Sequence, residues 1–122
     1  MAEWTIYYNE RCASCKKALD TLNANGIRPR IVEYLKNPPT VQELDDMLRK
    51  LGMVPEFIVR TNEPIYEQLK LNQGTRSRAE WLKIISAHPE LLQRPIVIKD
   101  NRGIIARPSE KISILLGSQP AA

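Results

Sequence analysis

Two closely spaced cysteines, Cys12 and Cys15, are the residues of this sequence best suited to chemistry. They follow the β-branched and aromatic run Thr5–Tyr8, which predicts a strand, and they precede apolar residues at helical spacing. A thiol at a helix N-terminus faces free backbone N–H groups and the positive end of the helix dipole, and both favour the thiolate. Further positive charge comes from three basic neighbours, namely Arg11, Lys16 and Lys17. We therefore expect Cys12 to be a nucleophile with a lowered pKa, and Cys15, three residues on, could resolve a mixed disulfide.

Two other uses of the cysteines have to be weighed. A structural zinc site normally has four Cys or His ligands, and this chain offers two cysteines and the single histidine His88. A zinc site is therefore not expected, and His88 reads as a capping or surface residue. Free cysteines are also common core fillers, an alternative that fits Cys15 better than Cys12. A C-x-x-C that follows a strand inside a βαβ unit is a moderately specific redox signal.

Three arginines stand at the ends of predicted elements: Arg60, Arg94 and Arg107. An arginine presents a planar fork of donors that suits oxyanions, and it stays charged in any environment. Each one alone is more typical of a solvated surface charge, and spacing alone does not show that the three converge. Arg94 precedes Pro95 at a strand start, and the sequence leaves the cis or trans state of that bond open.

The elements that must position these residues fall into three blocks. A strand, a helix from Lys16 to Asn25 and a second strand over Arg30–Leu35 form a βαβ unit with parallel strands. The last block is a hairpin followed by a helix. Its strands are expected at Pro95–Lys99 and Gly103–Ala106 around the turn Asp100–Gly103, and its helix opens at Pro108–Glu110 and ends at Gly117. Between the two blocks lie helices, expected at Thr40–Leu51, Pro55–Val59, Pro64–Leu71 and Ser77–Ala87, with a turn or short helix at Glu90–Leu92 and capping boxes at Thr40–Glu43 and Ser77–Glu80.

Length and composition limit the classes of protein that fit. The 122 residues suit one domain, and 43% apolar with 26% charged residues is the balance of a globular protein. The net charge of +4 is too small to indicate nucleic-acid binding, and the scattered aromatics form no stacking platform, with Trp4, Phe57 and Trp81 expected in core or half-buried positions. No apolar run is long enough for a membrane span, and the N-terminus does not resemble a signal peptide. We expect a cytoplasmic protein.

The whole pattern resembles the ArsC family of glutathione- and glutaredoxin-coupled arsenate reductases. The matching segments extend from Trp4 to about Leu116, and together they are specific. They are Tyr8-Asn9-x-x-Cys12, Tyr34-Leu35-x-x-Pro38-Pro39-Thr40, Arg60 within Phe57–Asn62, His88-Pro89, Arg94-Pro95-Ile96-Val97 and Arg107-Pro108-Ser109-Glu110. The resemblance implies an α/β, thioredoxin/glutaredoxin-like sheet in a single domain over residues 1–122, with a helical insertion at about 37–92.

The resemblance also implies an activity, the thiol-dependent reduction of arsenate to arsenite. In the family scheme Cys12 attacks arsenate to give a thioester-like arsenylated intermediate, and Arg60, Arg94 and Arg107 bind the oxyanion and stabilise the transition state. Glutathione then attacks the arsenylated cysteine, arsenite leaves, and glutaredoxin clears the mixed disulfide. No bound cofactor and no metal are expected; the reductant is external.

Two residues depart from the reductase pattern. Tyr8 stands where the reductases usually carry His, so any help from that imidazole is absent. Cys15 stands where they usually carry Ser, and the resulting C-x-x-C resembles the Spx family, thiol–disulfide regulators of the same fold that bind RNA polymerase. A Cys12–Cys15 disulfide would also allow recycling by thioredoxin. Against an Spx assignment, the chain keeps Arg60, Arg107 and the Arg-Pro-Ser-Glu segment.

Overall fold

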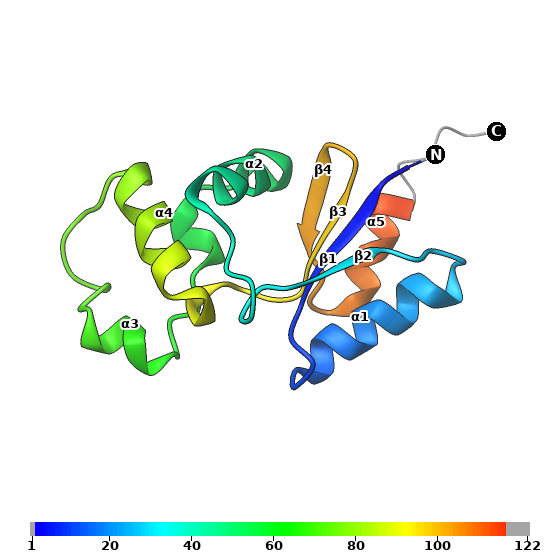
Figure 1. Cartoon of the computed structure of the whole chain (residues 1–122), viewed down its shortest axis with the longest axis horizontal. Coiled ribbons are helices and arrows are strands. Elements are labelled where there is room, and N and C mark those ends of the chain that lie inside the picture. The colour runs from blue at the N-terminus through cyan, green and yellow to red at the C-terminus, as the bar shows by residue number, and fades with distance from the viewer. Residues whose placement is uncertain (1, 117–122) are drawn as a thin grey trace. The chain divides into compact units, whose positions relative to one another are not determined.

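A computed structural model describes residues 2–116, and these residues form two compact units. The sheet unit comprises Met1–Tyr34 and Arg94–Ala122, of which residues 2–34 and 94–116 are described, and the helical unit comprises Leu35–Gln93. Figure 1 draws each unit and labels its strands and α-helices. None of the helices among the described residues has both the length and the apolar character needed to cross a membrane. The expectation of one domain with an insertion at about 37–92 stays a prediction.

A four-stranded mixed sheet forms the centre of the sheet unit, in the order β2-β1-β3-β4. Strand β1 (Trp4–Tyr8) pairs in parallel with β2 (Arg30–Glu33) and antiparallel with β3 (Ile96–Lys99), and β3 pairs antiparallel with β4 (Arg102–Ile105). The predicted βαβ unit and hairpin are both present, so the α/β fold class is confirmed.

Helix α1 (Ala13–Ala24) and the C-terminal helices η3 (Ser109–Ile112) and α5 (Ser113–Leu116) pack together on one face of the sheet. The apolar positions of α1 at helical spacing supply this packing, as the sequence predicts. The core cluster consists of Ile6, Ala18, Leu22, Val97, Ala106, Ile112 and Leu115. Because α1 is buried along this side, its first turn is held firmly against the end of β1.

Two capped helices organise the helical unit. Helix α2 (Val41–Leu51) begins at Thr40 and α4 (Arg78–Ala87) begins at Ser77, and each start is a complete capping box with Glu43 or Glu80. Both boxes are predicted correctly, and Gly52 ends α2 in the left-handed conformation, with φ of 66°. The remaining elements are short: η1 (Pro55–Ile58), α3 (Pro64–Gln68) and η2 (Pro89–Leu91).

Several sequence predictions need correction. Helix α1 begins at Ala13 rather than Lys16, because Cys12 is itself the N-terminal cap, and β2 stops at Glu33 rather than Leu35. The hairpin turn is shorter than predicted, since Arg102 belongs to β4 and only Asp100 and Asn101 link the strands. Asp100 takes a positive φ of 52°, which an aspartate tolerates better than most residues.

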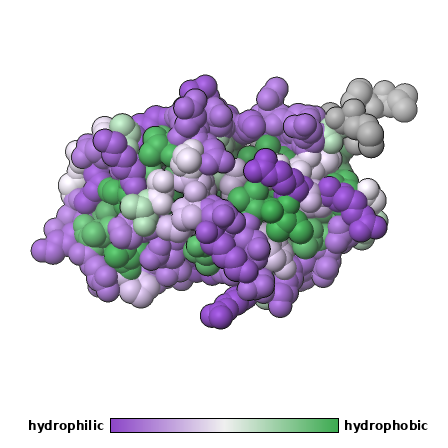
Figure 2. Space-filling view, in the orientation of Figure 1, coloured by the Kyte–Doolittle hydropathy of each residue, from purple (hydrophilic) through white to green (hydrophobic). Residues whose placement is uncertain are grey.

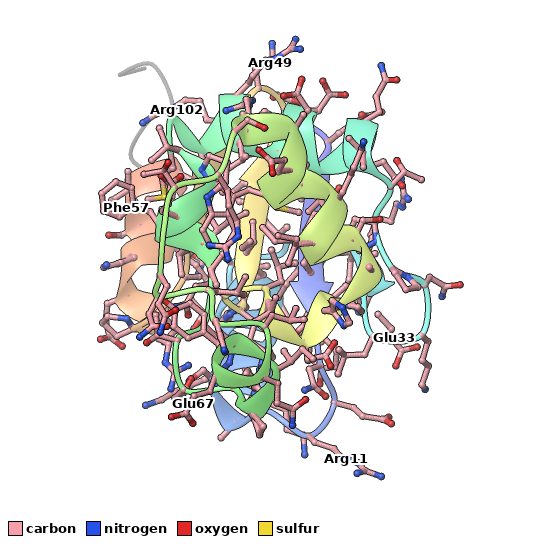
Figure 3. The ribbon with its side chains drawn as sticks, turned by 90° about the vertical axis from the view of Figure 1, so that its left-hand side faces the viewer. Arg11, Glu33, Arg49, Phe57, Glu67 and Arg102 are labelled. Atoms are coloured by element: carbon pink, nitrogen blue, oxygen red, sulfur yellow. The ribbon has the colours of Figure 1, made fainter. Side chains whose placement is uncertain are left out.

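Other corrections concern side chains and the end of the chain. Phe57 does not fill a core position: its side chain is 70% exposed and points away from the ribbon (Figure 3). Trp81 is buried and Trp4 half-buried, as expected. The last helix is a 3-10 turn that continues into α5, and its predicted end at Gly117 lies outside the described residues.

Candidate functional site

The topology of the sheet places the carboxyl ends of β1, β2 and β4 and the amino end of β3 at one edge. Because β1 and β2 are parallel, their carboxyl ends meet there, with Tyr8 opposite Glu33, so the chain leaves toward Cys12 from one strand and toward Tyr34 from the other. Strand β3 runs antiparallel to β1, and β4 runs antiparallel to β3. The first residue of β3, Ile96, therefore pairs at this edge with the last residue of β4, Ile105. Arg94 precedes β3 and Arg107 follows β4, so both arginines stand at the same edge as Cys12.

Cys12 caps the N-terminus of α1 and is a buried but not fully enclosed thiol, 9% exposed. Its backbone is extended, with its N–H donating to the Asn9 carbonyl at 3.0 Å, and Asn9 Oδ1 accepts from the N–H of Arg11 at 3.0 Å. This turn holds the thiol over the first free N–H groups of the helix.

Opposing effects act on the pKa of Cys12, and the lowering effects win. Burial is the largest single effect and favours the neutral thiol, but the backbone N–H of Cys15, the Arg94 guanidinium and the Cys15 thiol all donate hydrogen bonds to the sulfur. The charge of Arg94 favours the thiolate as well. The pKa of Cys12 therefore lies below the ordinary thiol value, as the sequence predicts.

Cys15 has the opposite character. It is fully buried in the first turn of α1, and burial raises its pKa to about 12. The N–H of Asn9 donates to its sulfur, but its own S–H donates to Cys12, which further favours the protonated form. At neutral pH Cys15 is therefore a neutral thiol in contact with the Cys12 sulfur, and both cysteines are free.

Half-buried Arg94 and fully buried Tyr34 are polar neighbours of the thiols. Arg94 hydrogen-bonds to Cys12, and it lies near enough to the Tyr34 hydroxyl to stabilise the negative charge of a phenolate. These two side chains do not form a hydrogen bond of good geometry: the Tyr34 hydroxyl and Arg94 Nε each lack a hydrogen-bond partner. Burial without a partner is unfavourable for the Tyr34 hydroxyl and for Arg94 Nε.

The source of positive charge at the thiol differs from the sequence prediction. Arg11, Lys16 and Lys17 are exposed, and Arg11 points away from the ribbon (Figure 3). The strongest charged partner of Cys12 is instead Arg94, which lies 82 residues away in the sequence. Tyr8, the residue in place of the family's histidine, has a raised pKa because of burial, and it stays neutral at physiological pH.

The two other predicted arginines are placed differently. Arg107 is exposed at the thiol edge, and like Arg94 it precedes a cis proline: the Arg94-Pro95 and Arg107-Pro108 bonds are both cis. Arg60 belongs to the helical unit, where its Nε donates to Glu63 at 3.2 Å and its side chain is 12% exposed. Its backbone N–H donates to the carbonyl of Leu91 at 2.6 Å. Cys12, Cys15 and Arg94 are thus in contact, and Arg107 lies at the same edge of the sheet. Arg60 belongs to the helical unit.

Tyr34 is a residue of the site for which the sequence predicts no role. It appears only as part of a matching segment, directly after a predicted strand. The available signal is that β2 is parallel to β1, which makes the residue after β2 a neighbour of the residues after β1. Among residues 2–116, no three His, Cys, Asp or Glu side chains gather closely enough to hold a metal ion.

Comparison with known proteins places the chain among relatives of this architecture. The model of the ArsC family matches residues 7–115. The chain belongs to the ArsC family. An arsenate reductase of Neisseria meningitidis is 35% identical over 117 residues, which cover 95% of this chain and all of the relative. An arsenate reductase of Escherichia coli is 32% identical over 123 residues, covering all of this chain and 87% of the relative.

Other ArsC relatives agree in fold. The solved structure named as an arsenate reductase from Vibrio cholerae superimposes with a TM-score of 0.89 at 29% identity, over 92% of this chain and 96% of that one. This match confirms the thioredoxin-like α/β fold. An E. coli relative at 33% identity over 113 residues, covering 92% of this chain and 95% of the relative, carries the name uncharacterized protein YfgD. Family membership alone therefore does not fix the substrate.

Proposed function

We propose that this protein reduces arsenate to arsenite through covalent catalysis by Cys12. The observation that carries the proposal is the hydrogen bond between Arg94 and the Cys12 sulfur at the N-terminus of α1. A thiol of lowered pKa beside a half-buried guanidinium, whose buried Nε has no partner, suits attack on a tetrahedral oxyanion. The names of the relatives, which match nearly the full length of this chain, support arsenate as that oxyanion.

The first step joins sulfur to arsenic without a change of oxidation state. The Cys12 thiolate attacks dihydrogen arsenate, a sulfur–arsenic bond forms, and one arsenic–oxygen bond breaks. The leaving hydroxyl takes up a proton, the one that the Cys12 thiol released when it ionised, and departs as water. The intermediate is the thioester-like arsenylated cysteine, in which arsenic is still pentavalent. Arg94 offsets the negative charge that would otherwise repel the thiolate from the oxyanion, and a hydrogen bond to a charged group contributes about 1.5–3 kcal/mol.

The second step transfers two electrons. A second thiol attacks the Cys12 sulfur, a disulfide forms, and the electron pair of the sulfur–arsenic bond stays on arsenic, which leaves as trivalent arsenite. The proton of the attacking thiol goes to arsenite. If that thiol is glutathione, glutaredoxin clears the mixed disulfide; if it is Cys15, the product is a Cys12–Cys15 disulfide for thioredoxin to reduce.

Arg60 and Arg107 are proposed as further oxyanion-binding residues on the family resemblance. Support for Arg107 is its place at the thiol edge of the sheet. Arg60 belongs to the helical unit, and its role rests on the resemblance alone. Their exposed or ion-paired states predict smaller effects on the Cys12 thiol than that of Arg94.

Arsenite production tests the function. The protein is assayed in parallel with glutathione plus glutaredoxin and with thioredoxin plus its reductase, each beside an active arsenate reductase as a positive control. Steady turnover with one donor is expected, and it identifies the reductant. No turnover with either donor, under conditions where the control enzyme works, would overturn the proposal. Cys15→Ser then separates the routes: retained turnover assigns the second thiol to glutathione, and lost turnover assigns it to Cys15.

The contact between the two thiols favours a second candidate, a redox-switched regulator of the Spx type. A Cys12–Cys15 disulfide would remove the thiolate and change the start of α1. This reading predicts that RNA polymerase is captured by the protein in only one oxidation state. Two free thiols by mass spectrometry after mild peroxide treatment would refute the switch.

A further inference from the structure

The Tyr34 hydroxyl is a buried polar group that has no role in the proposed reaction. Tyr34 is fully buried at the end of β2, and its oxygen has no hydrogen-bond partner. A buried hydroxyl without a partner is unfavourable, and a phenylalanine would fill the same space without that penalty. The hydroxyl is therefore the part of this side chain that needs an explanation.

The surroundings of the hydroxyl point to a missing acceptor. The charges of Arg94, Cys15 and Cys12 all act on the Tyr34 hydroxyl, so its surroundings are the polar ones of the thiol edge rather than an apolar part of the core. A guanidinium has donors only, so the lone pairs of the phenol face Arg94 and its O–H remains free to donate. Burial raises the pKa of Tyr34 to about 12, which keeps that proton in place at neutral pH.

A second unpartnered donor lies in the same region. Arg94 Nε is also buried without a partner, while the guanidinium of Arg94 hydrogen-bonds to Cys12. Among the described residues, these two atoms are the buried side-chain polar atoms without a partner. Two donors left free beside one nucleophile suit a ligand with several acceptor oxygens at fixed angles, which is what a tetrahedral oxyanion presents.

We propose that the Tyr34 hydroxyl donates a hydrogen bond to the oxyanion that Arg94 holds at Cys12. This inference rests on the proposed function, because it concerns the same anion. Tyr34 is then a substrate-contacting residue: Arg94 Nε–H and Tyr34 O–H bind different oxygens of one tetrahedral group. A planar or monoatomic anion could not reach both donors equally well, so the pair favours arsenate, phosphate and sulfate over nitrate or chloride.

Protection of Cys12 against iodoacetamide tests the contact without any turnover. The alkylation rate at pH 7 is measured over a range of inorganic phosphate concentrations in the native protein and in Tyr34→Phe, with chloride at matched ionic strength. We expect half-protection of Tyr34→Phe to need about tenfold more phosphate, the size of one hydrogen bond to a charged group. Tyr66→Phe, the same change in the helical unit, should protect like the native protein. Thermal unfolding midpoints with and without phosphate give a second readout.

Each outcome decides the question. Equal phosphate protection in native protein and Tyr34→Phe would overturn the contact, and so would failure of phosphate and sulfate to protect the native protein. A rise in the pH midpoint of alkylation without any anion would assign Tyr34 to holding Arg94, and this too would overturn the proposal. If native protein is protected by phosphate through Tyr34 but produces no arsenite, the arsenate reductase activity fails while the Tyr34 contact stands.

Discussion

The thiol edge of the sheet unit and the capped helices of the helical unit differ in how far their polar groups are satisfied by hydrogen bonds. In the helical unit, Thr40 and Ser77 complete reciprocal capping boxes, and Arg78 donates to Asp45 at 2.8 Å. At the thiol edge, Cys12 is a buried group stabilised as an anion, while Tyr34 and Arg94 Nε keep unused hydrogen-bonding capacity.

This difference separates residues that stabilise the fold from residues held ready for a ligand. Satisfied polar groups gain nothing from a ligand, whereas buried unsatisfied donors bind an acceptor without a further cost of ordering. The face drawn in Figure 2 gives no such indication, since it is mostly hydrophilic with separate apolar patches. Substitutions at the thiol edge should therefore change reactivity, and substitutions at the helix caps should change stability.

The largest expected effect is that of Cys12→Ser. A serine hydroxyl is not ionised near neutral pH, so replacing the low-pKa thiol removes the nucleophile. We expect arsenite production to fall by at least about 1,000-fold and the fast phase of alkylation at pH 7 to disappear, with the thermal midpoint little changed. Fast alkylation that survives in Cys12→Ser, measured by mass spectrometry of the modified peptide, would show that Cys15 is the reactive thiol.

Arg94→Ala should have the next largest effect, and it concerns pH. Thiolate forms as pH rises through the pKa, and Arg94 lowers that pKa through a hydrogen bond and its charge. Its removal moves the pH midpoint of alkylation upward, so that at pH 7 the thiolate fraction and the reactivity fall, by about 10- to 100-fold. The matched control is Arg78→Ala in the helical unit, whose midpoint should equal that of the native protein. An unshifted midpoint in Arg94→Ala would refute the Cys12–Arg94 contact.

The helix caps should show the reverse pattern. Thr40→Ala and Ser77→Ala each remove the oxygen that accepts from the N–H of Glu43 or Glu80, and we expect each to lower the free energy of unfolding by about 1 kcal/mol. Denaturant titration measures this loss, and the pH midpoint of Cys12 alkylation should stay unchanged. A midpoint shift in either variant would end the division of roles between the two regions.

Features of the fold that rest on local signals could be predicted from the sequence. Both capping boxes, the left-handed Gly52 and the thiol at the start of a helix follow from residue types within four positions of one another. The hairpin is also local, yet its turn is shorter than the sequence predicts, because Asp100 adopts a positive φ and closes the turn with Asn101 alone.

Features of the site that depend on strand pairing could not be predicted in the same way. The sequence indicates the chemistry of Arg94 and its place before a strand, but the contact of Arg94 with Cys12 arises only because β3 runs antiparallel to β1. The place of Tyr34 at the thiol edge depends on the parallel pairing of β1 and β2, which no local signal shows. The basic neighbours Arg11, Lys16 and Lys17 are exposed, since closeness in sequence at a helix start does not direct long side chains toward the thiol.

Phe57→Ser should have the smallest effect, and it tests whether the helical unit contributes only to stability. The Phe57 side chain is 70% exposed, so its removal should change the free energy of unfolding by less than about 0.5 kcal/mol. Leu48→Ala, at a buried position of α2, is the matched contrast and should cost about 2–5 kcal/mol. Both values come from denaturant titration. Phe57→Ser could keep its stability and its thiol reactivity but lose turnover with only one of the two reductant systems. The helical unit would then have a role in recognising that reductant, and it would not be separate from the chemistry of Cys12.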